Sequence, residues 1–157
     1  MRALIVYDSE FGNTEKIALA IAGGIEKCRA ETVKVTEAGG IGLQQVSLLI
    51  VGSPTRGFRP TPAIMKFLEG IPDGVLNDVA VAAFDTRVKS EDIRGRLFRM
   101  IVDTGGYAAN PIAERLRKKG GILVLPPEGF YVEGEKGPLK EGEEIRAGAW
   151  AKMACHA

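Results

Sequence analysis

The sequence predicts a three-layer α/β fold in which helices cover both faces of a five-stranded, doubly wound parallel sheet. Five short segments have the composition and length of strands, and segments with helical spacing lie between most of them. Strands that alternate with helices form parallel sheets, because each crossover returns the chain to the same end of the sheet. The predicted strands are residues 3–7, 32–36, 48–51, 79–84 and 122–125.

The composition of each strand predicts its place in the sheet. Residues 48–51 and 79–84 are continuous apolar runs, which is typical of strands buried on both faces. In residues 32–36, Val33 and Val35 alternate with polar residues, so this strand is expected at an edge with one face in water. Phe84 ends its predicted strand and is expected in the core.

Capping signals predict two helices in the first half of the chain. One begins near Asn13 and carries an apolar face. Another has Thr61 as its N-cap and Pro62 at its first position, and it ends at Gly70. The apolar face of the first helix consists of Ile17, Ala18, Ile21 and Ile25.

Three more helices are predicted in the second half. Asn110 and Pro111 repeat the capping signal, and Gly120 with Gly121 ends that helix. Ser90 is expected to cap a short helix, and the last helix is expected to begin near Glu141. Residues 128–142 are glycine-rich but contain aromatic residues, so a loop or hairpin packed on the body is expected. The residues expected on the inner faces are Ile93, Leu97 and Met100 in the short helix, and Ile145, Ala149 and Trp150 in the last.

Composition excludes several classes of function. A net charge of +1 favours neither a nucleic-acid partner nor a membrane surface. No apolar run reaches the ~20 residues that span a bilayer, and no signal-peptide pattern is present. Two cysteines fit a reducing compartment, and a single histidine disfavours a histidine-based metal or catalytic site. We therefore expect residues 1–157 to form one cytoplasmic domain without a metal.

The loops after the first, third and fourth strands are the expected ligand site, because ligands bind at the carboxyl ends of such sheets. They are residues 8–14, 52–61 and 85–92. The first loop places Gly12 and several hydroxyl and amide groups at the start of a helix, where free N–H groups and the helix dipole attract a phosphate. The alternative is a well-capped helix that holds nothing.

Residue patterns exclude related phosphate-binding loops. The first loop has no Gly-Lys-Ser/Thr, as a nucleoside-triphosphate loop requires, and only one of the glycines of a dinucleotide fingerprint. It has no cysteine nucleophile of a tyrosine phosphatase. A receiver domain would need an aspartate after the third strand, where Gly52 and Ser53 stand.

The Ser-x-x-Gly-Asn-Thr-Glu loop, the Gly-x-Pro-Thr at 52–55 and the order of strands and helices resemble those of the flavodoxin family. The resemblance covers nearly the whole chain and implies strand order 2-1-3-4-5 and noncovalent FMN. It implies that the FMN phosphate lies on residues 9–14 and the flavin ring between the 54–59 and 85–88 loops. The implied contacts are Ser9, Glu10, Phe11, Gly12, Asn13 and Thr14, then Pro54, Thr55, Arg56, Gly57 and Phe58, then Asp85, Thr86 and Arg87.

Four features differ from the family pattern. Phe11 stands where the usual loop has threonine, and Asp8 precedes the loop, where we expect it to turn away and brace the backbone as an Asx-turn. Phe58 is the only aromatic residue of the second loop. Typical flavodoxins are strongly acidic, whereas this chain is nearly neutral and its loops contain Arg56, Arg59 and Arg87. These arginines could raise the flavin potential, bind an acidic partner or bind a nicotinamide phosphate. The alternative is that they are solvated and have no such role.

The resemblance therefore implies an electron carrier between redox partner proteins, with no catalytic residue of its own. One alternative is an FMN-dependent NAD(P)H:quinone or acceptor oxidoreductase, since Pro54-Thr55-Arg56 also resembles a motif of flavodoxin-like reductases. Another is a flavin-free interaction module of the same fold.

Overall fold

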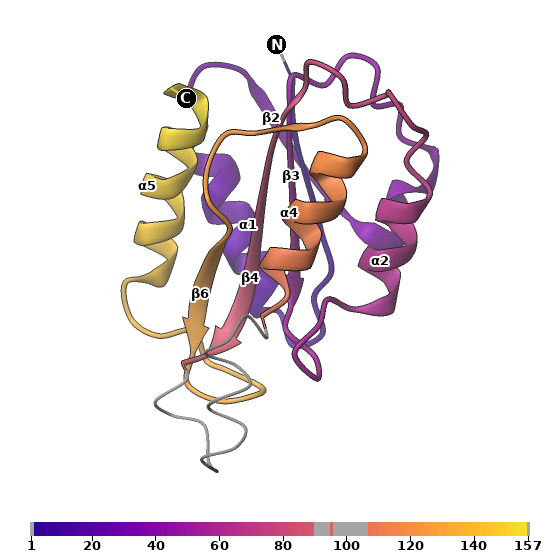
Figure 1. Ribbon diagram of the computed structural model, residues 1–157. Coiled ribbons are helices and arrows are strands. Elements are labelled where there is room, and N and C mark those ends of the chain that lie inside the picture. The colour runs from indigo at the N-terminus through magenta and orange to yellow at the C-terminus, as the bar shows by residue number, and fades with distance from the viewer. Residues whose placement is uncertain (1, 90–94, 96–106, 157) are drawn as a thin grey trace.

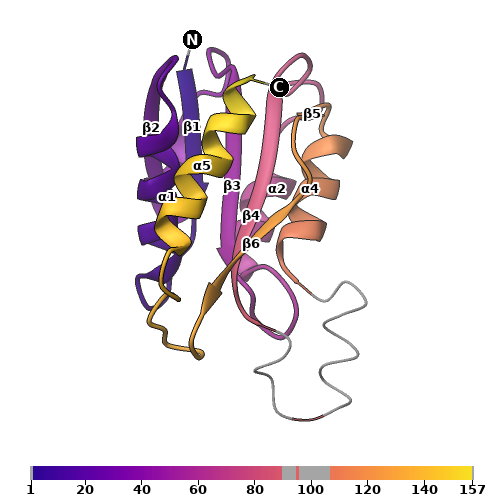
Figure 2. The same cartoon turned by 90° about the vertical axis from the view of Figure 1, so that its left-hand side faces the viewer.

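The computed structural model describes residues 2–89, 95 and 107–156. Its strands form one parallel sheet in the order β2-β1-β3-β4-β5, with a further strand, β6, also paired to β4. Helices α1 and α5 cover one face, and α2 and α4 cover the other (Figure 1). Figure 2 shows the same layers after a quarter turn. The predicted three-layer fold and the strand order 2-1-3-4-5 are confirmed.

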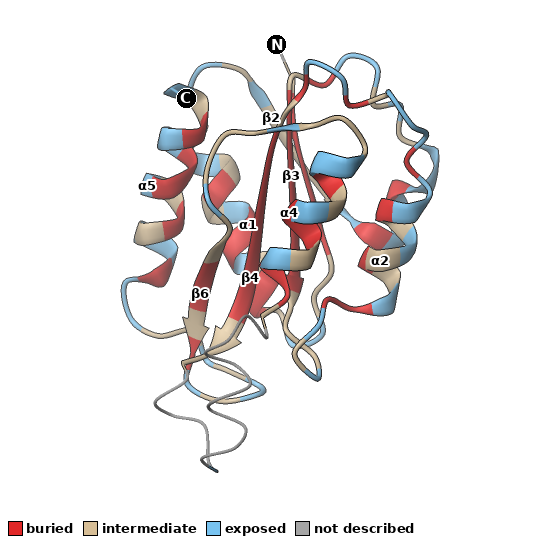
Figure 3. Cartoon of the chain, viewed as in Figure 1, coloured by how far each residue is buried: buried red, intermediate tan, exposed pale blue. Residues whose placement is uncertain are grey.

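The sheet centre consists of β1 (Arg2–Tyr7), β3 (Leu48–Pro54) and β4 (Ala80–Val88). These strands are almost wholly buried, as their continuous apolar composition predicts (Figure 3). Phe84 is fully buried and lies opposite Gly52 in the register. A Cβ atom on Gly52 would meet the Phe84 ring at 2.0 Å, so only glycine fits there.

The first two predicted helices are confirmed. Helix α1 (Asn13–Gly24) buries Ile17, Ala18 and Ile21 against the sheet. Helix α2 (Pro62–Glu69) begins as the Thr61-Pro62 signal predicts: the Thr61 hydroxyl accepts the Ile64 N–H at 3.4 Å, and Gly70 is the C-cap. The predicted short helix after Ser90 lies outside the described residues.

The second strand is shifted from its predicted position. Strand β2 spans Arg29–Lys34, while Val35 and Thr36 belong to a 3₁₀ helix, η1 (Val35–Gly40). The prediction of an edge strand is confirmed, since β2 is at the end of the sheet order and pairs with β1. The alternation of valine and polar residues predicts the bounds of this strand wrongly. Val35 is buried in the same core cluster as residues of α2, but it belongs to η1 and not to the strand.

The fifth strand is divided. Strand β5 is only Ile122–Leu123, and β6 (Glu128–Val132) continues beside the C-terminal half of β4. Leu123 pairs with Val81 and Glu128 with Phe84, so residues 124–127 stand opposite residues 82–83. Pro126 and Pro127 lie in this interruption, where neither has an N–H to donate to the ladder. The predicted strand 122–125 is therefore too long, and residues 128–132 are a strand that the sequence analysis placed in a loop or hairpin.

Helix α4 (Ala109–Lys118) begins before its predicted cap. Its N-cap is Ala108, whose side chain makes no capping bond, so the predicted Asn110 cap is wrong. The caps come from other elements: Asp85 accepts the Ala109 N–H at 2.9 Å, and Thr55 accepts the Ala108 N–H at 3.2 Å.

Helix α5 (Glu143–His156) turns a different face inward than predicted. Ile145 is 82% exposed and Ala149 is exposed, while Ala147, Trp150, Ala151 and Ala154 are buried. The reason is close packing on α1: a Cβ on Gly24 would meet the Gly148 carbonyl oxygen at 2.3 Å. Small residues at this contact set the rotation of the helix, and only the prediction for Trp150 is confirmed.

Candidate functional site

A small cavity lies at the carboxyl ends of the central strands, where three predicted loops and a fourth segment meet. Its volume is about 110 Å³. Pockets for whole drug-sized ligands are roughly 300–1,000 Å³, so this cavity is suited to one group of a larger ligand. The lining residues are Glu10, Phe11, Asn13, Thr14, Pro54, Thr55, Arg56, Thr86, Arg87, Val88, Val132 and Glu135.

Polar side chains of the first loop hydrogen-bond to the backbone of the loop and of the first turn of α1. Gly12 has φ 91°, a left-handed conformation that favours glycine, and it precedes the first residue of α1. The Ser9 hydroxyl accepts the Gly12 N–H at 3.1 Å and the Glu15 N–H at 3.4 Å. The Asp8 carboxylate bonds to the backbone of the loop, accepting the N–H of the next residue, Ser9, at 2.9 Å. The expected Asx-turn would instead use the N–H two residues after the aspartate.

Two backbone donors at the start of α1 remain available. Within the described part of the chain, the N–H groups of Asn13 and Thr14 meet no acceptor, as is usual for the first turn of a helix. Both residues line the cavity. Their side chains are engaged elsewhere: the Asn13 amide donates to the Lys136 carbonyl at 3.2 Å, and the Thr14 and Thr86 hydroxyls lie 2.8 Å apart. The cavity therefore faces free donors at the positive end of a helix dipole.

The second loop ends in a tight hairpin. Arg56 and Arg59 exchange both backbone hydrogen bonds, at 2.7 and 2.9 Å. The two residues between them, Gly57 and Phe58, have φ of 52° and 66°. Two consecutive positive φ values define a type I′ turn, and Phe58 is an unusual residue for its second position.

Arg56 connects three segments around the cavity. Its guanidinium forms an ion pair with Glu10 of the first loop, and it donates to Glu135 at 2.7 Å. It also lies over the Phe11 ring, 5.1 Å from the centroid. Its Nε atom is buried and meets no acceptor among the described residues. An unpaired buried donor is costly, so this atom is an unsatisfied polar group of a residue that lines the cavity.

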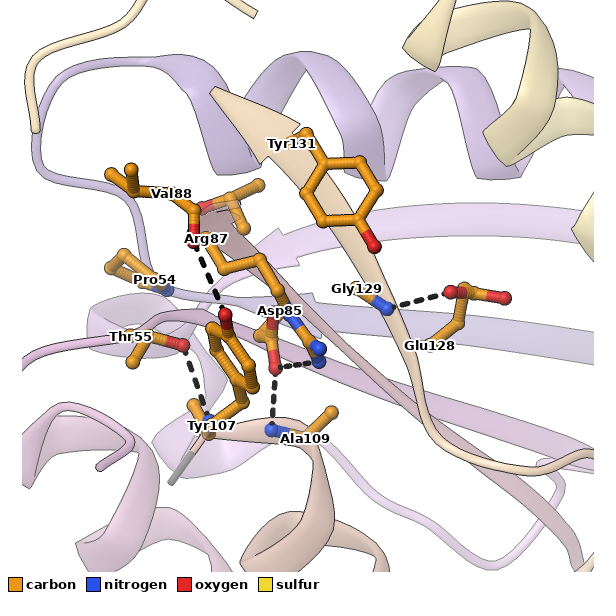
Figure 4. Close-up of polar contacts among 12 residues, drawn as sticks. Pro54, Thr55, Asp85, Arg87, Val88, Tyr107, Ala109, Glu128, Gly129 and Tyr131 are labelled. Atoms are coloured by element: carbon orange, nitrogen blue, oxygen red, sulfur yellow. Dashed lines mark hydrogen bonds and ion pairs between the residues drawn. The ribbon is translucent and has the colours of Figure 1, made fainter. Parts of the chain in front are cut away.

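Residues 85–88 are predicted as part of the third loop, but they belong to β4, which is therefore longer than the predicted strand 79–84. This end of β4 contains a buried ion pair that contacts the start of α4. Asp85 is fully buried and accepts two bonds of 2.7 Å from the Arg87 guanidinium (Figure 4). The guanidinium lies 3.7 Å from the centroid of the Tyr107 ring, and the Tyr107 hydroxyl donates to the Val88 carbonyl at 3.3 Å. Gly129 provides the space, because a Cβ there would meet Arg87 Nε at 2.0 Å.

Burial and pairing act in opposite directions on this pair. Burial raises the pKa of the Asp85 carboxyl, against the lowering effects of the Arg87 guanidinium and the Ala109 N–H. Burial disfavours the charged form of Arg87, but its bonds to Asp85 outweigh this and raise the guanidinium pKa. The pair fixes the start of α4 and the end of β4, which is a structural task.

Most of the predicted site residues meet at the cavity, and some do not. Ser9 and Gly12 shape the first loop, and Gly57 and Phe58 form the hairpin tip, without lining the cavity. Asp85 faces α4 on the other side of the sheet. Direct contacts of all these residues with a ligand stay predictions. Val88 lines the cavity and belongs to the predicted 85–88 segment, although it is not among the individually predicted contacts. Val132 and Glu135 are not predicted at all; a strand at 128–132 would have pointed to them, since its carboxyl end adjoins that of β4.

Aromatic residues divide between core and cavity. Phe84, Phe130 and Trp150 pack edge to face with centroids 6.0–6.4 Å apart, so Phe84 and Trp150 are core residues as predicted. Phe11 is 41% exposed beside the cavity. Across the described residues, we find neither a cluster of potential metal ligands nor a helix with the length and hydropathy of a membrane span.

The fold and this loop define a class: a doubly wound α/β domain with a glycine-containing loop at the carboxyl edge of its sheet, which leads into a helix. Residues 4–120 match the family model described as "Flavodoxin domain". The chain therefore belongs to the flavodoxin domain family. A search of curated proteins finds no match.

Solved structures share this fold at low sequence identity. Oxidised Flavodoxin 1 from Bacillus cereus is 18% identical with a TM-score of 0.77, over 99% of this chain and 98% of that chain. A flavodoxin from the domain Archaea is 21% identical with a TM-score of 0.73, over 99% and 97%. Rubredoxin oxygen:oxidoreductase from Desulfovibrio gigas is 20% identical with a TM-score of 0.71, over 99% of this chain and 35% of that one.

Proposed function

We propose that the protein binds FMN without a covalent bond and passes electrons between redox partner proteins. The observation that carries the proposal is the pair of free N–H groups on Asn13 and Thr14, beside left-handed Gly12 at the cavity. A phosphate group suits the size and the donors of this cavity. Membership of the flavodoxin family supports a flavin as the molecule that carries the phosphate.

FMN, when bound, supplies the redox chemistry, and the chain supplies binding, orientation and electrostatics. The backbone of residues 9–14 would hold the phosphate. The hairpin at Arg56–Arg59 and the end of β4 flank the opening and would orient the ring. We assign no catalytic acid, base or nucleophile.

A carrier is favoured over an NAD(P)H reductase by the state of Arg87. Its guanidinium is paired with the fully buried Asp85 and lies over the Tyr107 ring. This cation is therefore matched within the chain, which argues against its use for nicotinamide phosphates. NADPH and NADH should be oxidised slowly by the FMN-loaded protein with a quinone acceptor; rapid turnover would establish the reductase instead. We also propose a cytoplasmic location, consistent with two free cysteines.

FMN titration followed by flavin fluorescence tests the anchoring loop. Wild-type protein should quench FMN at one equivalent per chain. Gly12→Val should weaken binding more than about tenfold, because a side chain strains the left-handed turn that positions the loop. Thr14→Ala should weaken it about fivefold, through the first turn of α1.

Gly74→Val is the matched control, because Gly74 also has a positive φ, 85°, but lies outside the site. It should lower stability without changing FMN affinity. If both loop variants bind FMN as tightly as the wild type, the anchoring assignment is wrong. A colourless wild-type protein that leaves FMN fluorescence unchanged would favour the flavin-free interaction module.

A further inference from the structure

The two ion pairs of Arg56 support a further inference, which rests on the proposed FMN site and deepens it. Arg56, Glu10 and Glu135 all line the cavity that also exposes the free N–H groups of Asn13 and Thr14. The guanidinium of Arg56 reaches from the second loop and is shared by two carboxylates, one of which, Glu10, belongs to the loop expected to hold the phosphate.

We propose that Glu135 and Glu10 hold Arg56 as a carboxylate clamp that the flavin phosphate must displace, and that Glu135 thereby sets the preference between phosphorylated and unphosphorylated flavin. Guanidinium groups bind carboxylate and phosphate with the same pairs of N–H donors, so the two anions compete for one cation. The buried Nε atom of Arg56, which meets no acceptor, is the additional donor that a phosphate could use.

The local charge favours displacement of Glu135 rather than Glu10. Glu135 is the more exposed of the two, with 72% of its side chain accessible against 55% for Glu10, so it loses less on leaving. It also lies on the 133–138 segment, whereas Glu10 belongs to the phosphate loop itself. With Glu135 in place, the three side chains carry a net charge of −1 and oppose a phosphate monoester of −1.5 to −2.

The same segment has a second tie to the first loop, which remains when Glu135 changes. The Lys136 carbonyl accepts the Asn13 amide at 3.2 Å, and the Lys136 ammonium lies 5.9 Å from the centroid of the Phe11 ring. Removing the Glu135 charge should therefore alter the electrostatics of the cavity and leave the segment in place.

Two ligands and a matched control test the clamp. We would measure dissociation constants of FMN and riboflavin for wild type, Glu135→Gln and Glu133→Gln at low salt. Glu133 is an exposed carboxylate of the same segment and lies outside the cavity lining. Glu135→Gln should tighten FMN about fivefold and leave riboflavin unchanged, while Glu133→Gln should change FMN less than about twofold. Arg56→Gln combined with Glu135→Gln should lose the gain.

The outcomes separate the clamp from the proposed function. Equal weakening of both flavins by Glu135→Gln would show that the contact only fastens the segment, and the clamp would be wrong. Unchanged FMN affinity in Glu135→Gln, with a wild type that binds FMN, overturns the clamp and leaves the FMN site intact. A wild type that binds neither flavin overturns both.

Discussion

The loop after β1 and the last residues of β4 border the same cavity but differ in how their polar groups are paired. At the start of α1, the N–H groups of Asn13 and Thr14, two residues that line the cavity, meet no acceptor in the described part of the chain. In β4, the Asp85 carboxylate accepts three hydrogen bonds, two from Arg87 and one from Ala109. Unpaired polar groups suit ligand binding, and fully paired ones suit a structural role. The comparison shows that charge near a site does not by itself mean contact with the ligand.

The largest expected effect concerns the buried pair of Asp85 and Arg87 in β4. Asp85→Ala should lower the free energy of unfolding by about 3–5 kcal/mol, because it leaves the largely buried Arg87 without its partner and uncaps α4. Urea denaturation of the apoprotein measures the loss.

Asp73→Ala is the control, since the Asp73 side chain is 93% exposed and its pair with Lys119 is 3.4 Å long. It should cost less than about 1 kcal/mol. Equal losses in the two variants would mean that the Asp85 pair is not a scaffold element.

A smaller effect, dependent on pH, is expected where β6 meets α5. Glu143 is buried there and accepts bonds from the Tyr131 N–H at 2.8 Å and from the Arg146 guanidinium at 2.7 and 3.0 Å. Burial would raise the Glu143 pKa, but the bonds from Arg146 and Tyr131 outweigh it and lower the pKa. The ionised form is therefore the stabilising one.

Glu143→Gln should cost about 2 kcal/mol at pH 7. A carboxyl whose pKa is lowered by folding stabilises the fold above its unfolded pKa, here 4.5, and loses this contribution as the pH falls through the folded pKa. The difference between wild type and variant should thus be constant near neutral pH and shrink below pH 4.5, as pH-dependent urea denaturation would reveal. Glu144→Gln, at an exposed neighbour, should show no such trend. A difference that persists at acid pH would contradict the assignment.

The smallest effect concerns the link between the two loops. Thr14 of α1 and Thr86 of β4 are buried with their hydroxyls 2.8 Å apart. Thr86→Val should destabilise the fold by about 1 kcal/mol, because the Thr14 hydroxyl loses its partner. Thermal denaturation measures this against Thr32→Val on the edge strand, which should stay within about 0.5 kcal/mol of wild type. Equal effects would mean that the hydroxyl bond adds nothing.

The sequence predicts the parts of this molecule that depend on local pattern. Continuous apolar runs locate the central strands, and Thr61 with Pro62 marks the start of α2. Gly12 and the polar residues around it locate the first loop. These signals depend on residues that are close together in the sequence, so they can be recognised before the fold is known.

The errors occur where a distant residue decides the outcome. Helix α4 is capped by Thr55 of the loop after β3 and by Asp85 of β4, and so begins before Asn110. The rotation of α5 follows from the approach of Gly148 to Gly24, so the large Ile145 is left outside. The role of Glu135 likewise depends on Arg56, which lies far away in the sequence.

The interruption of the fifth strand by Pro126 and Pro127 bears on how the domain meets other copies of itself. An uninterrupted outer strand offers a row of free N–H and C=O groups to which a strand of another molecule can add. Here the row is broken between β5 and β6, and the prolines have no N–H to offer. At the opposite margin, β2 carries Arg29, Glu31 and Lys34. Both margins of the sheet are thereby protected against growth into a larger aggregate.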